Sequence, residues 1–95
     1  MKIYIVEEEY SNNAAWADER IEGKDILDVC ASMEIATDVI NKEIALKGKS
    51  WHRCKPYDPK SDHNRYWIAC ITNDVEDYYD IKECNYYVIE KEVKS

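Results

Sequence analysis

The 95-residue chain lacks the features of a membrane or secreted protein. Its longest apolar runs fall far short of the ~20 residues that a membrane-spanning helix needs. Its opening, MKIYIV, has no basic start followed by an apolar middle and a small-residue cleavage site. The four cysteines form no CxxC pair, as a redox or zinc motif would. We therefore expect a cytoplasmic protein with no membrane partner, whose cysteines are buried free thiols.

Glycine and proline are also scarce, with two residues of each, whereas 45% of the residues are apolar. Such a composition is typical of a folded globule and not of a solvated tail. A chain of this length cannot be divided into halves that each bury enough apolar surface to offset the entropy of ordering the backbone. We therefore expect one domain over residues 1–95.

No catalytic signature or cofactor motif is present, so we predict no enzyme activity, no cofactor and no metal. A zinc site is the first alternative, because His52, Cys54 and His63 with a nearby Asp58 or Asp62 would supply four ligands. Their spacing matches no zinc pattern.

A thiol nucleophile is the second alternative. Cys54 lies between Arg53 and Lys55, and cationic neighbours are what makes a thiol reactive. Nothing in the sequence supplies an oxyanion hole. Close pairs among the twenty acids are expected by chance, so paired carboxylates do not indicate a hydrolase.

The first strand is predicted over residues 2–8, where a continuous β-prone run is typical of a strand inside a sheet and covered on both faces. Glu7, Glu8 and Glu9 would emerge at its far end. Residues 14–22 are predicted either as a short helix ended by Gly23 or as an irregular excursion within a hairpin.

Residues 26–47 admit two interpretations. Apolar residues recur at spacings of three and four, as in one long helix. Ser32, however, fits a helix N-cap, Glu34 fits the first turn, and Gly48 fits the position past the end. We therefore prefer a strand over 26–31 and a helix over 33–47 that buries the apolar residues Ala36, Val39, Ile40 and Ile44.

The second half of the chain predicts a hairpin and a final strand. SWHRCKPY and RYWIACIT flank the turn-forming DPKSDHN, which indicates a hairpin with a long tip. In its second strand, Tyr66, Ile68 and Cys70 would share one face, and Trp67, Ala69 and Ile71 the other. NDVEDYYD predicts one acidic helical turn. The segment IKECNYYVIEKEV predicts a strand with Tyr87 and Ile89 on one side and Tyr86 and Val88 on the other.

These elements predict an α+β domain with a small antiparallel or mixed sheet of four to five strands and one main helix packed on it. The opening MKIYIVEEEY, the helix SMEIATDVINKEI and the terminal YYVIEKEV resemble, in their order, many small bacteriophage and mobile-element proteins. The resemblance implies a protein that binds and blocks a host protein, as anti-CRISPR and anti-restriction proteins do. The shared pattern consists of core residues and a helix cap, so the resemblance assigns no functional residue.

Charge is distributed unevenly along the chain, whose formal net charge is -7. Residues 1–34 hold nine acids and three bases, residues 35–72 hold four and seven, and residues 73–95 hold seven and three, giving -6, +3 and -4. Six bases fall within residues 47–67. Two interpretations of this stretch compete: it neutralises acids of its own fold, or it binds a ligand.

The leading functional prediction is an acidic surface that docks on a host protein, with or without mimicry of a nucleic-acid backbone. Tyrosines among carboxylates bring a large contact area at low entropic cost. The predicted partner-binding residues are Glu8, Glu9, Asp74, Glu76, Asp77, Tyr78, Tyr79, Asp80 and Glu83, with Glu7 and Tyr10 beside them.

The alternative prediction is a nucleotide or nucleic-acid site in the basic, aromatic stretch. Bases there would meet phosphates, and aromatic rings would stack on nucleobases. The residues predicted for it are Trp51, Arg53, Lys55, Arg65 and Trp67. Homodimerisation through an exposed strand edge is compatible with either function, since a small sheet must protect its edges.

Overall fold

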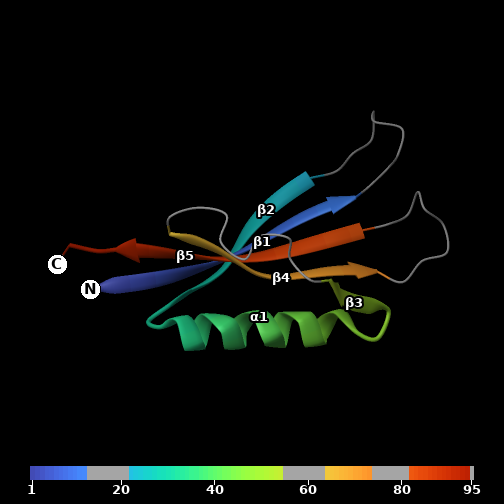
Figure 1. Ribbon diagram of the computed structural model, residues 1–95, viewed down its shortest axis with the longest axis horizontal. Coiled ribbons are helices and arrows are strands. Elements are labelled where there is room, and N and C mark those ends of the chain that lie inside the picture. The colour runs from blue at the N-terminus through green and yellow to red at the C-terminus, as the bar shows by residue number, and fades with distance from the viewer. Residues whose placement is uncertain (13–21, 55–63, 74–81, 95) are drawn as a thin grey trace.

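One helix packs on one face of a five-stranded antiparallel sheet (Figure 1). The computed structural model describes residues 1–12, 22–54, 64–73 and 82–94. The elements are β1 (Lys2–Asn12), β2 (Glu22–Cys30), α1 (Met33–Lys47), β3 (Trp51–Cys54), β4 (Arg65–Asn73) and β5 (Lys82–Glu92). The strand order is β2-β1-β5-β4-β3. The predicted α+β class, with one main helix on a small sheet, is confirmed.

The first and last strands pair along their whole length in the middle of the sheet. The register runs from Lys2 opposite Glu92 to Asn12 opposite Lys82, and the Val93 amide donates to the Met1 carbonyl oxygen at 2.7 Å. The two termini therefore lie side by side (Figure 1). The interior position predicted for the first strand is confirmed.

The three glutamates of β1 do not emerge at a strand end as predicted. Pairing with β5 continues the strand to Asn12, so Glu7, Glu8 and Glu9 lie within it and alternate between faces. Val6 is fully buried on the helix side, whereas Ile5 points to the opposite face and is only partly buried. The prediction that this strand is buried on both faces is therefore wrong, because only its helix face is fully buried.

Helix α1 begins and ends where its caps predict. The Ser32 side chain accepts a hydrogen bond from the Ile35 amide at 3.1 Å, and Gly48 follows the helix with φ at 90°. Ala36 and Ile40 are fully buried, while Val39 and Ile44 are partly buried against the same core. The strand-then-helix interpretation of residues 26–47 is therefore confirmed.

The sheet has two faces, which we call the helix face and the open face. On β5, Cys84, Tyr86 and Val88 are buried on the helix face, and Tyr87 and Ile89 alternate with them, as predicted. Val6, Ile40 and Ile71 complete the group of largest fully buried side chains. No described element packs on the open face.

A β-bulge between Trp67 and Ala69 corrects the predicted faces of β4. Tyr66 lies opposite Val88, and Ala69 lies opposite Tyr86, so both belong to the helix face. Trp67 lies opposite Tyr87 on the open face. Ile68 is the extra residue of the bulge. Strict alternation through this strand therefore wrongly placed Tyr66 and Ala69 on opposite faces.

Three of the four cysteines, Cys30, Cys70 and Cys84, are buried free thiols, as predicted. No helix in the described ranges is long and apolar enough to cross a membrane. The predicted short helix at 14–22, the hairpin tip and the acidic turn after Asn73 fall largely or wholly on residues 13–21, 55–63 and 74–81, outside the described residues.

Replacing Ile40 with alanine should lower the free energy of unfolding by about 2–5 kcal/mol, because it leaves a cavity between α1 and the sheet. Urea denaturation followed by circular dichroism measures the change. Leu46→Ala is the matched control: this residue of the same helix is 80% exposed, so a change within about 0.5 kcal/mol is expected. Equal effects of the two variants would contradict the described core.

Candidate functional site

The structure does not bring together the residues of the predicted nucleotide site. Trp51 and Arg53 lie opposite Asn73 and Ile71 in β4, and Arg53 donates to the Asn41 Oδ1 atom of α1 at 2.7 Å, on the helix face. Arg65 and Trp67 lie on the open face, opposite Ile89 and Tyr87 of β5. Lys55 falls outside the described residues. The four described residues therefore do not line one groove.

The predicted acidic surface is described only in part. Residues 74–80 lie outside the described ranges. Glu8 is 7% exposed and points to the helix face, so it does not lie on an outward surface as expected. Glu9 is partly exposed on the open face, and Glu83 accepts hydrogen bonds from Asn85 at 3.0 Å and from the Cys70 thiol at 3.5 Å.

Arg65 organises the centre of the open face. Its Nη2 atom lies 2.8 Å from Glu7 Oε1 and 3.2 Å from Glu9 Oε2. Its guanidinium carbon lies 3.6 Å from the centroid of the Tyr87 ring. Burial acts to lower the pKa of Arg65, but the hydrogen bond and charge of Glu7 outweigh it and raise the pKa. This base of the 47–67 stretch thus neutralises acids of its own fold.

Large apolar side chains surround this ion cluster. Trp67 stacks on Tyr87 with ring centroids 6.2 Å apart and planes inclined by 21°. Ile5 lies between Val29 of β2 and Ile89 of β5 in the registers of both strand pairs. We define the open-face patch as Ile3, Ile5, Ile26, Val29, Trp67, Tyr87 and Ile89.

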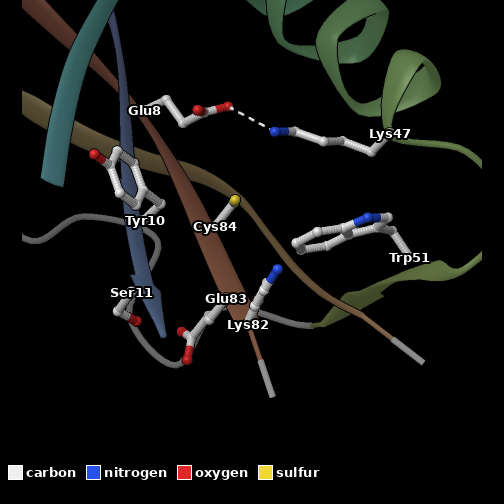
Figure 2. Close-up of a pocket in the computed structure, with 8 residues that line it drawn as sticks. All are labelled: Glu8, Tyr10, Ser11, Lys47, Trp51, Lys82, Glu83 and Cys84. Carbon is white, nitrogen blue, oxygen red and sulfur yellow. Dashed lines mark ion pairs between the residues drawn. The ribbon is translucent and has the colours of Figure 1, made fainter. Parts of the chain in front are cut away.

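A pocket of about 370 Å³ lies where β1 ends, β5 begins and α1 reaches its last turn (Figure 2). Glu8 and Lys47 point toward each other across it, and Trp51 forms a wall below Lys47 in this view. Tyr10 stands on the other side, with its ring against Gly23, where no larger residue fits without moving that ring. The lining residues are Glu8, Tyr10, Ser11, Lys47, Trp51, Lys82, Glu83 and Cys84.

The Glu8 carboxylate is the buried charge of this pocket. Its Oε2 atom lies 3.8 Å from Lys47 Nζ, beyond hydrogen-bond distance, and the Lys47 ammonium lies 5.7 Å from the centroid of the Trp51 ring. Burial raises the pKa of Tyr86, and a hydrogen bond to the adjacent Glu8 carboxylate and the charge of that carboxylate raise it further. The carboxylate of Glu8 therefore lies between the Lys47 ammonium at the pocket and the buried Tyr86 phenol beneath it.

Cys84 lies on the β5 side of the same pocket. Burial raises the pKa of its thiol, the Lys47 ammonium lowers it, and the carboxylates of Glu8 and Glu83 raise it further. A raised pKa keeps the thiol protonated and unreactive at neutral pH. Among the described residues, no group of three or more His, Cys, Asp and Glu side chains could hold a metal ion. His63, Asp58 and Asp62 of the zinc hypothesis lie outside them.

Sequence reasoning missed this pocket because it ended the first strand at Glu8. Once the strand is extended, the period of two places Tyr4, Val6, Glu8 and Tyr10 on one face, and this signal was present in the sequence. The approach of Lys47 and Trp51 to Glu8 depends on how α1 crosses the sheet, which no local pattern gives.

No family model, curated protein or solved structure matches the chain.

The reactivity of Cys84 should depend on pH and on the two charges beside it. Alkylation by iodoacetamide, followed by peptide mass spectrometry, should show a midpoint for Cys84 above that of an ordinary thiol. Glu8→Gln removes a negative charge and should lower this midpoint, whereas Lys47→Met removes a positive charge and should raise it. A midpoint that moves with neither variant would contradict the described pocket.

Proposed function

We propose that this chain is a small, non-catalytic binding protein that docks on a partner protein through the open-face patch. The observation that carries the proposal is the row of apolar side chains on a sheet face that no described element covers. The resemblance to small bacteriophage proteins makes a bacterial host protein the partner we propose. Binding would then block or modulate that protein.

The composition of the patch favours a protein partner. Exposed contiguous apolar surface on a small domain usually marks an interaction site. Ile26 is 67% exposed and Val29 is 54% exposed, both on the edge strand β2. Trp67, Tyr87 and Arg65 belong to the residue types that contribute most to binding energy at interfaces. Their mutual contacts hold them in place before binding, which lowers the entropic cost of association.

Charge defines the expected partner further. Arg65 is shared by Glu7 and Glu9, so the ion cluster on the open face carries one net negative charge. The whole chain has a formal net charge of -7. Such a field accelerates association with a basic surface and opposes approach to a polyanion. We therefore propose a partner with an apolar surface bordered by lysine and arginine, which includes nucleic-acid-binding proteins.

The acidic tyrosine segment remains a predicted second contact. Asn73 and Lys82, which flank it, lie in β4 and β5, the strands that also carry Trp67 and Tyr87. The Lys82 amide donates to the Asn73 Oδ1 atom at 2.8 Å, so the two ends of the segment are joined. The proposed contact residues of the segment are Asp74, Glu76, Asp77, Tyr78, Tyr79 and Asp80, followed by Glu83 in β5.

Placing aspartates at Ile26 and Val29 should reduce capture of the partner at least about tenfold, because two carboxylates would be buried without partners in the interface. Capture from a bacterial lysate on immobilised protein, quantified by mass spectrometry, measures the loss. The matched control, Ile35→Asp with Leu46→Asp, adds the same charge at exposed apolar positions of α1 and should keep capture. Equal losses in both double variants, or none in either, would refute the open face as the docking surface.

Light scattering of the same variants separates a foreign partner from self-association. If the wild-type chain is a dimer and only the Ile26 and Val29 variant is monomeric, the occupant of the patch is a second copy, and the proposed foreign partner is wrong. A wild-type monomer that captures one host protein through the patch supports the proposal.

Reversing the charge of the acidic segment tests the second contact. Lysine at Asp74, Glu76, Asp77 and Asp80 should abolish capture of a basic partner, since attraction becomes repulsion. The control reverses four exposed acids elsewhere, at Asp25, Glu34, Asp38 and Glu92. If the control loses capture equally, only the total charge matters; unchanged capture by the first variant would remove the segment from the site.

A further inference from the structure

The two edge strands of the sheet differ in length. β3, at one edge, has four residues, whereas β2, at the other edge, has nine and contains no proline (Figure 1). An edge strand presents backbone N–H and C=O groups that can pair with a further strand, and proteins usually keep such edges short or interrupted. No described strand pairs with the outer side of β2. This edge is therefore a template for an added strand.

The hydrogen-bond pattern shows where β2 directs its backbone groups outward. Alternate residues of an antiparallel strand direct their N–H and C=O groups to opposite sides. The Glu90 amide donates to the carbonyl oxygen of Asn64, just before β4, at 2.8 Å, so Tyr87 directs its groups toward β1. Its partner Glu7 therefore bonds to β5 and turns away from β2. Ile26, opposite Glu7, consequently directs its N–H and C=O groups to the outer edge.

A bulge limits how much of this edge can pair. The register with β1 shifts at Leu27, and beyond it the Val29 amide donates to the Asp28 carboxylate at 2.8 Å. Before the bulge, residues 22–26 pair with β1 in unbroken register. Because the period of two holds there, residues 22, 24 and 26 all direct one donor and one acceptor outward.

The side chains along the edge differ between the two faces. Asp25 and Asp28 lie opposite helix-face residues of β1, and both are exposed. Ile26 and Val29 are exposed on the open-face side, where Lys24 would repel a base. An added strand that fits this edge therefore alternates between basic residues beside the aspartates and apolar residues beside Ile26 and Val29.

A second copy of the chain fits this edge poorly. Antiparallel pairing of two β2 strands requires a two-fold axis perpendicular to the sheet, which keeps both helices on the same side. Asp25 and Asp28 of both copies would then meet at one seam, and like charges across a strand pair are destabilising. A basic segment replaces this repulsion with attraction.

We propose that β2 binds an extended segment of the partner protein as a sixth, antiparallel strand. Its apolar residues lie on the open-face side, and its lysines or arginines lie on the helix-face side. The inference rests on the proposed function, because it names the part of the partner that pairs beside the open-face patch. Every described strand pair is antiparallel, so the added strand continues the pattern of the sheet.

Fluorescence polarisation with a labelled seven-residue peptide of alternating lysine and valine tests the proposal. The wild-type protein should bind this peptide. A peptide of the same composition, with four lysines followed by three valines, should bind at least about tenfold more weakly, because it cannot present one class of side chain to each face.

Methylation of the peptide nitrogens separates backbone pairing from charge. Directly opposite residues share a face, so the valines opposite Lys24 and Ile26 direct their N–H groups toward β2. N-methylation of the valines should weaken binding at least about tenfold, whereas N-methylation of the lysines, whose N–H groups point away, should leave the affinity nearly unchanged. Both methylated peptides carry the same charge.

Two pairs of variants test the protein side. Lys24→Pro removes an outward N–H at an edge position that tolerates proline and should weaken peptide binding, whereas Lys24→Ala removes the same charge and should not. Asp25→Lys with Asp28→Lys should abolish binding, and Glu34→Lys with Asp38→Lys on α1 should retain it. Thermal denaturation confirms that each variant is folded; if Lys24→Pro is not, the methylated peptides decide.

Three results would overturn the inference. They are no polarisation change at about 1 mM alternating peptide, equal effects of the two methylated peptides, and equal peptide binding by folded Lys24→Pro and Lys24→Ala.

Capture of the partner distinguishes this failure from that of the proposed function. If the Ile26 and Val29 aspartate variant loses capture and Lys24→Pro keeps it, the partner docks on the open-face patch without adding a strand. If the aspartate variant keeps capture, the proposed function is wrong, and the peptides still decide whether β2 accepts a strand. Because Asp25 lies on this edge, reversing only Glu34, Asp38 and Glu92 is the charge control that leaves the edge intact.

Discussion

The antiparallel pairing of the first strand with the last is the constraint on which the rest of the molecule depends. It joins residues that are 70 to 90 positions apart along eleven consecutive register pairs, and it places both strands inside the sheet. A non-local pairing of this length is entropically costly to form, so it must be supported by the side chains that it buries. Val6, Tyr86 and Val88, all fully buried, are that support.

This central pair also divides the charged residues into two chemically different sets. Glu7 and Glu9 point to the open face, where Arg65 reaches both across the Tyr87 ring. Glu8 points the other way, where the ammonium of Lys47 stops short of hydrogen-bond distance. Of three consecutive glutamates, two therefore pair with a guanidinium on the open face, and one is buried beside an ammonium on the helix face. The difference follows from the pleat of the strand alone.

The two faces consequently favour different kinds of interaction. The open face is broad and apolar around a fixed ion cluster, which suits contact with another protein surface. On the helix face α1 covers the core, and a pocket lies near the last turn of this helix. Because Trp51 and Trp67 lie on opposite faces, the basic stretch 47–67 contributes to both regions and forms neither by itself. Among its described bases, Lys47 and Arg65 neutralise acids of the same fold, whereas Arg53 donates to Asn41.

Local signals predicted the helix and most strands. Ser32 and Gly48 mark the ends of α1 because capping depends only on nearby backbone groups. The alternation of Tyr86, Tyr87, Val88 and Ile89 was likewise visible, since a regular strand has a strict period of two. The period of two failed in β4, because the bulge at Ile68 reverses the faces of the residues that follow it. In β1 the period was applied only to residues 2–8, although the strand continues to Asn12. Where a strand bulges or continues is decided by its pairing with the neighbouring strands, and not by its own residues.

The amino-acid order by itself determined the elements, the α+β class and the excess of acid, because propensity, capping and charge are properties of short segments. Only the tertiary structure decided that Glu8 is buried, that Arg65 spans two glutamates and that Trp51 faces away from Trp67. These contacts join positions far apart in the chain. Their geometry follows from strand order, register and the path of the helix, which emerge only when the whole core packs at once.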